Sequence, residues 1–207
     1  MSKRTNPFKK TGYPKNKYQK TGKKQSLSTY SNNRKHYVKR HVNLGLVGLS
    51  GINDTSGGFG FRLADVPGNA ELISLYDQFK ICSVKLVFYP KQTQTARVDT
   101  SDNVRGNSRF GIAVDLNDIT PPATFDDLRQ YESCKVTPLV DRHEVYVNRP
   151  LYLNPSGQNV NDWLSTSAST TTFNGVKWFG EATGITTATQ FTYQVEAVYY
   201  LGFKNIK

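Results

Sequence analysis

The most constraining feature of the sequence is a long alternation of apolar and polar residues near its C-terminus. From Phe191 to Phe203 every second residue is apolar, and the residues between them begin with Thr192, Gln194 and Glu196. A period of two places successive side chains on opposite faces of a β-strand, so one face of this strand is expected to be buried. Such a strand needs neighbours in a sheet and a second layer that covers its apolar face.

Shorter segments with the same period supply those neighbours. Near Tyr37 one face carries Val38, Arg40, Val42, Leu44 and Leu46. In Lys80–Pro90 one face carries Cys82, Val84, Leu86 and Phe88. In Arg109–Leu116 it carries Phe110, Ile112, Val114 and Leu116. Further strands are predicted around Val145 and Val147, and over Val176–Ala182.

Two short helical segments interrupt the strands. Leu72, Leu75, Tyr76 and Phe79 have the spacing of one helical face and follow a Pro-Gly pair. Thr124 and Asp127 have the spacing of a capping box, so these acids indicate a helix start rather than a catalytic pair.

Together these elements predict an all-β protein, an eight-stranded jelly-roll β-sandwich with short helical insertions and a disordered basic N-terminal arm. The segment Gly57-Gly58-Phe59-Gly60 is interpreted as a turn between two strands. Residues 91–108 and 154–175 form long polar connections, which are candidates for subunit contacts or outer surface. Trp163, in the second connection, either anchors an interface or folds back onto its own sandwich.

The first 41 residues differ in charge from the rest of the chain. They hold 13 of the 27 Lys and Arg and no Asp or Glu, whereas the remaining residues hold the other 14 cations and all 16 acids. Residues 1–36 also lack hydrophobic periodicity, and such a segment buries too little apolar surface to offset its ordering entropy. We therefore expect a disordered basic arm over residues 1–36 and a folded jelly-roll domain over residues 37–207.

Aromatic residues are spaced among the cations at Phe8, Tyr13, Tyr18, Tyr30 and Tyr37. Cations neutralise phosphates and release counterions, and a ring can stack on an unpaired base for about 1–3 kcal/mol. The arm is therefore predicted to bind single-stranded nucleic acid with little sequence specificity. The predicted binding residues are Lys3, Arg4, Lys9, Lys10, Lys15, Lys17, Lys20, Lys23, Lys24, Arg34, Lys35, Lys39 and Arg40. A nuclear-targeting role is compatible with the same charges.

No catalytic, metal or cofactor site is predicted, because the sequence lacks the motifs of hydrolases, nucleotide-binding loops and zinc proteases. His36 and His41 are interpreted as additional cationic or hydrogen-bonding groups, and His143 is placed on a solvated strand face. Cys82 is interpreted as a small buried hydrophobe, with a disulfide or redox role as the alternative. Neither Cys82 nor Cys134 has the spacing of a metal ligand. No apolar run approaches the ~20 residues of a membrane span, so no membrane partner is expected.

One stretch of the chain resembles a known family. Leu75-Tyr76-Asp77-Gln78-Phe79-Lys80-Ile81, followed by Val84-Lys85-Leu86-Val87-Phe88-Tyr89-Pro90, is similar to the short helix and strand of capsid proteins from circular, Rep-encoding single-stranded DNA viruses. The basic arm, the segment Tyr131–Pro138 and the pair Arg149-Pro150 also match that family in order.

The resemblance implies a capsid shell domain over residues 37–207 that assembles into a small icosahedral shell of about 60 copies, with the arms inside. Those arms would bring on the order of 800 positive charges to the cavity. The expected partners are single-stranded nucleic acid, DNA being favoured, host nuclear import factors and a cell receptor. The expected locations are the virion and, during assembly, the host nucleus. The alternatives are a satellite-like single-stranded RNA virus capsid, a non-capsid single-strand binding protein and a carbohydrate-binding jelly roll.

Overall fold

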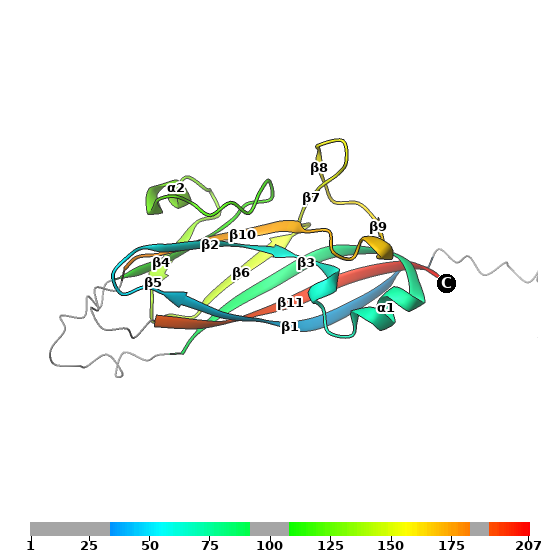
Figure 1. Ribbon diagram of the computed structural model, residues 1–207, viewed down its shortest axis with the longest axis horizontal. Coiled ribbons are helices and arrows are strands. Elements are labelled where there is room, and N and C mark those ends of the chain that lie inside the picture. Colours follow the sequence, from blue (N-terminus) through cyan, green and yellow to red (C-terminus); the bar gives the residue numbers. More distant parts are fainter. Residues whose placement is uncertain (1–33, 92–107, 183–190) are drawn as a thin grey trace, which may run out of the picture. The chain divides into compact units, whose positions relative to one another are not determined.

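The computed structural model describes residues 34–91, 108–182 and 191–207, all of which belong to one compact unit, Asn32–Lys207. This unit consists mainly of antiparallel strands in two facing sheets (Figure 1). No helix of the described residues is long and apolar enough to cross a membrane.

The first sheet, sheet A, has the strand order β1-β11-β3-β6. Its strands are β1 (His36–Leu49), β11 (Phe191–Ile206), β3 (Tyr76–Pro90) and β6 (His143–Asn148). A short strand, β9 (Leu164–Ser165), also pairs with the start of β3. The two strands at the ends of the chain are therefore neighbours in this sheet, although they lie more than 140 residues apart in sequence.

The second sheet, sheet B, has the strand order β2-β10-β4-β5. Its strands are β2 (Thr55–Phe61), β10 (Phe173–Gly180), β4 (Arg109–Val114) and β5 (Lys135–Pro138). A separate two-stranded ribbon pairs β7 (Tyr152–Leu153) with β8 (Asn159–Val160). Each of the two sheets has four main strands, and β4 and β5 are the only sheet neighbours among these eight strands that also follow one another in sequence. The predicted eight-stranded jelly roll is therefore confirmed.

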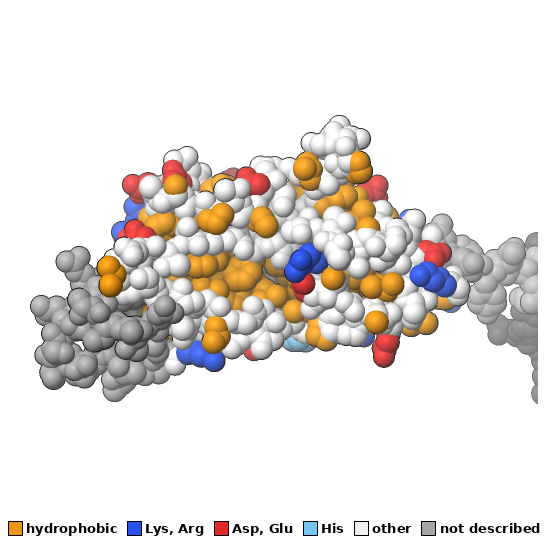
Figure 2. Space-filling model, viewed as in Figure 1, with side chains coloured by type: hydrophobic (Ala, Val, Ile, Leu, Met, Phe, Trp, Pro, Cys, Tyr) orange, Lys and Arg blue, Asp and Glu red, His pale blue; other side chains and the backbone are white. Residues whose placement is uncertain are grey.

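The core lies between the two sheets, and β11 contributes most to it. Its inward residues Phe191, Tyr193, Val195, Ala197, Tyr199, Leu201 and Phe203 are all buried, which confirms the alternation predicted for this segment. Complete burial of each large apolar side chain stabilises the fold by roughly 1.5–3 kcal/mol. Figure 2 shows hydrophobic side chains gathered along the seam between the β1 and β2 edges, where partly buried Leu44, Val47 and Phe59 pack against the core.

The helices are short. The capping box is confirmed: in α2 (Phe125–Arg129) the Asp127 amide donates to Thr124 Oγ1 at 3.1 Å, and the Thr124 amide donates to Asp127 Oδ2 at 2.9 Å. The helical face predicted from Leu72 to Phe79 is wrong in its second half. Helix α1 (Asn69–Leu75) ends where β3 begins, because pairing with β11 and β9 extends the chain from Tyr76 onward. Two 3-10 turns, η1 (Leu63–Asp65) and η3 (Thr166–Ala168), complete the helical content of the described residues.

The glycine-rich segment is a strand, not the predicted turn. Gly57, Gly58 and Gly60 belong to β2, the edge strand of sheet B. A Cβ atom at Gly57 would collide with the Trp178 ring, and one at Gly58 would collide with the Ile119 carbonyl. Glycine is needed here because other segments approach the backbone closely on both faces of the strand.

Two β-bulges change which side chains face the core. In β1 the register shifts between Asn43 and Gly45, where Gly45 has a φ of 91°. A glycine in the left-handed region is typical of a bulge, and the extra residue reverses the alternation beyond it. Leu46 was predicted to face inward, but it is 58% exposed, whereas Leu49 is buried.

The second bulge lies in β3 at Cys82. Ser83 pairs with Tyr200 and Ile81 pairs with Leu201, so Cys82 is the unpaired extra residue. Ile81 therefore occupies the core, and Cys82 lies half-buried on the outer face of sheet A. The prediction that Cys82 is a buried core residue is wrong for this reason. Burial of the thiol still raises the pKa of Cys82.

The outer face of sheet B is covered by the connection between β4 and β5. Phe125 and Leu128 of α2 pack on Ala113 and Phe179 as a second, smaller core cluster. Beside it lies Lys177, which is only 5% exposed and whose Nζ is 2.7 Å from Asp115 Oδ2.

The buried Lys177 side chain is fully partnered. Its Nζ is also 2.8 Å from Asp118 Oδ1 and donates to the Tyr131 hydroxyl at 3.0 Å. Burial alone would lower the pKa of Lys177, but the hydrogen bonds to these three partners raise it above its ordinary value. Burial alone would likewise raise the pKa of Asp115, but the hydrogen bonds from Lys177, the Asn117 amide and Tyr131 lower it.

Candidate nucleic-acid interface

Cations and aromatic rings gather on the outer face of sheet A, where β1 begins. Pairing of β1 with β11 places Lys39 opposite Tyr200 and Tyr37 opposite Gly202. Pairing of β11 with β3 places Lys80 on the other side of Gly202. Trp163 and Arg149 reach the same area from the β8–β9 connection and the end of β6. We call this area the arm-base surface: Lys35, Tyr37, Lys39, Lys80, Arg149, Trp163, Tyr200 and Lys204.

Trp163 folds back onto its own sandwich, as one of the two interpretations of the sequence proposed. A Cβ atom built on Gly202 would lie 3.2 Å from Trp163 Cη2 and 3.5 Å from Tyr37 Cε1. The absence of a side chain at Gly202 therefore lets the Trp163 ring lie against the sheet.

Lysines lie over the rings of this surface. Lys204 Nζ is 4.8 Å and Lys35 Nζ is 6.0 Å from the centre of the Trp163 ring, and Lys39 Nζ is 5.9 Å from that of Tyr200. Cation–ring contacts at exposed sites contribute about 0.5–1 kcal/mol each. They orient the lysines without neutralising their charge.

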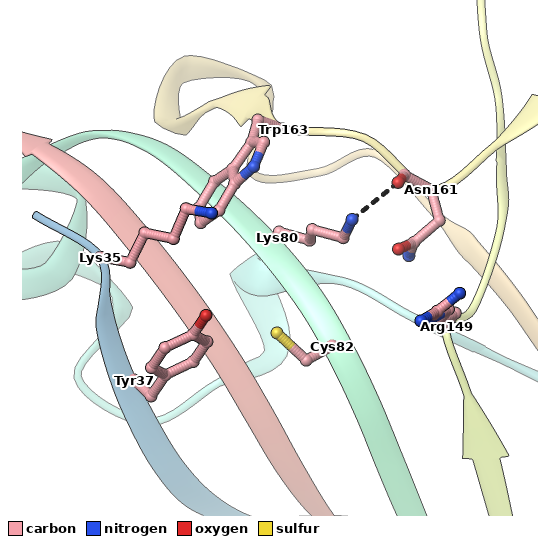
Figure 3. Close-up of a pocket in the computed structure, with 7 residues that line it drawn as sticks. All are labelled: Lys35, Tyr37, Lys80, Cys82, Arg149, Asn161 and Trp163. Atoms are coloured by element: carbon pink, nitrogen blue, oxygen red, sulfur yellow. Dashed lines mark hydrogen bonds between the residues drawn. The ribbon is translucent and has the colours of Figure 1, made fainter. Parts of the chain in front are cut away.

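A pocket of about 240 Å³ opens in this surface (Figure 3). It is lined by Lys35, Tyr37, Lys80, Cys82, Arg149, Asn161 and Trp163. The Lys80 ammonium donates to the Asn161 backbone carbonyl at 2.9 Å, and the Asn161 side-chain Nδ2 donates to the Ile81 and Pro150 carbonyls. These bonds fix the connection that carries Trp163 to the strands beneath it.

At the opposite end of the same face, the cations are paired with a carboxylate. There Lys85 Nζ is 2.5 Å from Glu144 Oε1, and Arg142 Nη2 donates to Glu144 Oε2 at 2.9 Å. The hydrogen bond from Lys85 is the largest cause of the lowered pKa of Glu144. None of the eight residues of the arm-base surface has such a carboxylate partner within the described part of the chain.

The residues predicted to bind nucleic acid are only partly brought together. Lys3 to Lys24 of the predicted set lie outside the described residues. Lys35 and Lys39 belong to the arm-base surface, and Arg34 is the first described residue. Arg40 lies on the other face of β1, opposite Tyr199 of the inward series, so it does not join Lys39.

Sequence reasoning did not propose Lys80, Arg149 or Lys204 as binding residues. The outward parity of Lys204 in the alternation of β11 was the available signal for that residue. Lys80 has the same parity in the sequence as Val84, Leu86 and Phe88, and only the bulge at Cys82 places it on the outer face. Arg149 had no such signal, because only the pairing of β6 with β3 places it near Cys82.

His143 is buried, not solvated as predicted. It is 3% exposed, its Nδ1 is 2.6 Å from Thr137 Oγ1, and its Nε2 is 3.1 Å from the Tyr193 hydroxyl. Burial lowers the pKa of His143 to about 4, so the ring is neutral near pH 7. His143 thus joins the two sheets by neutral hydrogen bonds. The described residues contain no group of three or more His, Cys, Asp or Glu side chains that could hold a metal.

Comparison with known proteins places these features in a family. The family model of the circovirus capsid protein matches residues 13–207. A sequence comparison with curated proteins gives no match.

Several solved virus structures have the same fold. The BFDV capsid protein of a 60-mer crystal structure is 14% identical, with a TM-score of 0.63 over 85% of this chain and 96% of that one. The BFDV capsid protein of a decameric structure is 15% identical, with a TM-score of 0.58 over 83% and 99% of the two chains. A tobacco necrosis virus chain is 12% identical, with a TM-score of 0.56 over 84% and 97%.

The structural likeness establishes the jelly-roll fold, and the family match covers nearly the whole sequence, including the stretch from Leu75 to Pro90. The chain belongs to the circovirus capsid protein family, and it is a viral capsid protein with a structural role in the virion.

Proposed function

We propose that the protein assembles into an icosahedral shell of about 60 copies and packages a single-stranded DNA genome through its basic arm and its arm-base surface. One similar protein, the BFDV capsid protein, forms a 60-mer in its crystal structure. The domain division follows from this proposal: residues 1–36 bind the genome, and residues 37–207 form the shell.

The observation that carries the proposal is the position of the cations along the chain and on sheet A. The 13 cations of the first 41 residues precede or begin β1, and the arm-base surface adds Lys80, Arg149 and Lys204 beside the same end of that strand. A polyanion bound there would meet positive charge and exposed rings together, which suits single strands. We infer that this side of sheet A faces the cavity.

The binding mechanism is non-catalytic. Lys and Arg release counterions from the strand, and rings stack on unpaired bases, so affinity depends strongly on salt and weakly on sequence. The remaining residues hold 14 cations and 16 acids, a near balance that lets neighbouring subunits touch without strong repulsion. The same cationic run would serve nuclear import before assembly.

Assembly and packaging can be tested on the full-length protein. Light scattering and negative-stain microscopy, with and without single-stranded DNA, are expected to show uniform small shells. The nucleic acid recovered from particles is expected to be digested by DNase and to resist RNase; the reverse result would favour an RNA genome. A protein that stays monomeric at every ionic strength, with or without DNA, contradicts the assembly proposal.

The role of the arm has its own test. Deletion of residues 1–36 is expected to lower retention of nucleic acid strongly and to flatten the dependence of log K on log salt, since each phosphate contact contributes about −0.7 to that slope for single strands. Unchanged retention after the deletion overturns this part of the proposal.

A further inference from the structure

Part of the pocket of the arm-base surface is built on strands. Lys80 and Cys82 come from β3, Tyr37 comes from β1, and Arg149 follows the last residue of β6 (Figure 3). All three strands belong to sheet A, so backbone ladders hold these residues at fixed spacings. A site on paired strands positions a ligand more precisely than a site on a loop does.

The pocket presents positive charge with no internal compensation. Three of its lining residues are cations, Lys35, Lys80 and Arg149, and none of the seven is an acid. No carboxylate in the described residues makes an ion pair with these three cations. Like charges brought together in this way favour binding of an anion.

An exposed ring stands beside these cations. Tyr37 lines the pocket and is 71% exposed, so one face of its ring is accessible. Trp163 forms another wall, with Lys35 and Lys204 over its ring. An accessible ring next to an anion site is the combination that binds a base and its phosphate.

The backbone beneath the pocket is locally irregular. Arg149 has a φ of 50°, a left-handed conformation that is unfavourable in a residue other than glycine. Its amide donates to the Cys82 carbonyl at 3.0 Å, at the bulge of β3. Bulges and residues with such a φ often orient side chains at functional sites.

We propose that this pocket binds one nucleotide of a single strand, with the phosphate between Lys80, Arg149 and Lys35 and the base stacked on Tyr37. The inference rests on the proposed packaging function and adds an ordered contact on each subunit to the contacts of the arm. The pocket volume of about 240 Å³ lies below the ~300–1,000 Å³ of sites that enclose drug-sized ligands, so the pocket would hold the phosphate while the base lies on the exposed face of Tyr37.

The cationic part of the site is tested with charge-matched variants of the full-length protein. Lys80→Gln with Arg149→Gln removes two charges from the pocket. Lys85→Gln with Arg142→Gln removes two charges that pair with Glu144 at the opposite end of the same face. In titrations with oligo(dT), the pocket variant is expected to show a salt slope shallower by about 1.4, and the control variant an unchanged slope. Equal slopes for the two variants overturn the proposal.

The stacking part needs a probe that contains bases and one that does not. Tyr37→Ala is expected to weaken oligo(dT) binding roughly 5- to 100-fold and to leave inorganic polyphosphate binding unchanged. Tyr37→Phe is expected to restore oligo(dT) affinity, and Tyr146→Ala, at the far end of the face, to have no effect. Equal losses for both probes, or no loss for either, contradict base stacking.

Tryptophan emission separates this inference from the packaging proposal. The chain has two Trp, and Trp178 is 7% exposed in the core, so a change of emission on oligo(dT) binding reports Trp163. DNA-filled shells without that change, and with full affinity in the pocket variant, contradict the pocket and leave packaging intact. Absence of any DNA binding by the wild-type protein contradicts both.

Discussion

The lysines on the two outer faces of the sandwich differ in whether carboxylates pair with them. On sheet B the connection between β4 and β5 covers Lys177, which contacts Asp115, Asp118 and Tyr131. On sheet A the described cations of the arm-base surface lie over rings or line an open pocket, without carboxylate partners. The comparison indicates that a lysine of the first kind stabilises the fold, whereas lysines of the second kind are available to a polyanion.

The largest expected effect comes from a substitution of Lys177 in the covered cluster on sheet B. Lys177→Met leaves Asp115 buried without its cation, and we expect a loss of about 3–5 kcal/mol in the free energy of unfolding. Urea denaturation of the full-length protein at pH 7 measures it. Lys85→Met, which removes a partly exposed lysine from sheet A, is the control and should cost much less than Lys177→Met. Similar losses for both variants would contradict the division between the faces.

The same cluster predicts an acid dependence. The pKa of Asp115 is lower in the folded protein than its unfolded value of about 3.9, so its stabilisation is complete above that value. It is lost as the pH falls through the lower folded pKa. The Lys177→Met variant should lack this part of the acid transition when unfolding is followed from pH 5 downward.

The next largest effect on stability is expected for His143, a buried residue whose hydrogen-bond partners are neutral. The pKa of His143 falls to about 4 in the fold, against an ordinary value of 6.5. The unfolded chain therefore binds a proton first, and stability should fall by up to about 3 kcal/mol between pH 6.5 and pH 4. Urea midpoints measured across this range should fall less steeply for His143→Gln. An equal slope in that variant would show that His143 does not titrate on unfolding.

Gly202→Val tests how Trp163 is held on the outer face of sheet A. The added side chain displaces the Trp163 ring, whose Cη2 lies 3.2 Å from the position of a Cβ atom at Gly202. Because that ring is half-buried on the outer face, we expect less than about 1.5 kcal/mol of destabilisation. Acrylamide quenching of Trp163 should increase. Unchanged quenching would show that Trp163 is not held against the sheet at this residue.

The smallest effect on folding is expected for Lys80→Gln. Lys80 is partly exposed and has no carboxylate partner in the described residues, and its hydrogen bond to the Asn161 carbonyl is the contact that the variant weakens. The free energy of unfolding should therefore change by less than about 1 kcal/mol. Its effect should appear instead in the salt dependence of oligo(dT) binding, by about 0.7 in the slope. A large loss of stability in this variant would show that Lys80, like Lys177, stabilises the fold.

Sequence reasoning succeeded where the controlling interactions are local. The alternation in β11 and the capping box of Thr124 depend on residues within a few positions of one another, so their patterns were sufficient. The inward placement of Val145 and Val147 followed from the same periodicity.

Sequence reasoning failed where contacts with a segment distant in sequence determine whether a side chain is buried. The bulges at Gly45 and Cys82 depend on how a partner strand pairs, and a single extra residue exposed Leu46 and moved Cys82 out of the core. The glycines of β2 are required by Trp178 and Ile119, which are far away in sequence. His143 became buried because Thr137 and Tyr193 satisfy its ring.

The sequence likewise predicted only part of the candidate site. The cationic bias of the N-terminal residues identified the partner class, and Lys35 and Lys39 lie on the surface that results. Lys80 and Arg149 could not be assigned, because they meet Tyr37 only through the pairing of β1, β11, β3 and β6.

The antiparallel ladder between β1 and β11 has a mechanical consequence. Paired residues run from His36 and Phe203 at one end to Leu49 and Phe191 at the other, and only the bulge between Asn43 and Gly45 interrupts them. Tension applied through the residues before His36, along the strand, loads the hydrogen bonds of this ladder in shear, so they must fail together rather than one at a time. The first strand can therefore withstand pulling on the N-terminal segment while the sandwich remains closed.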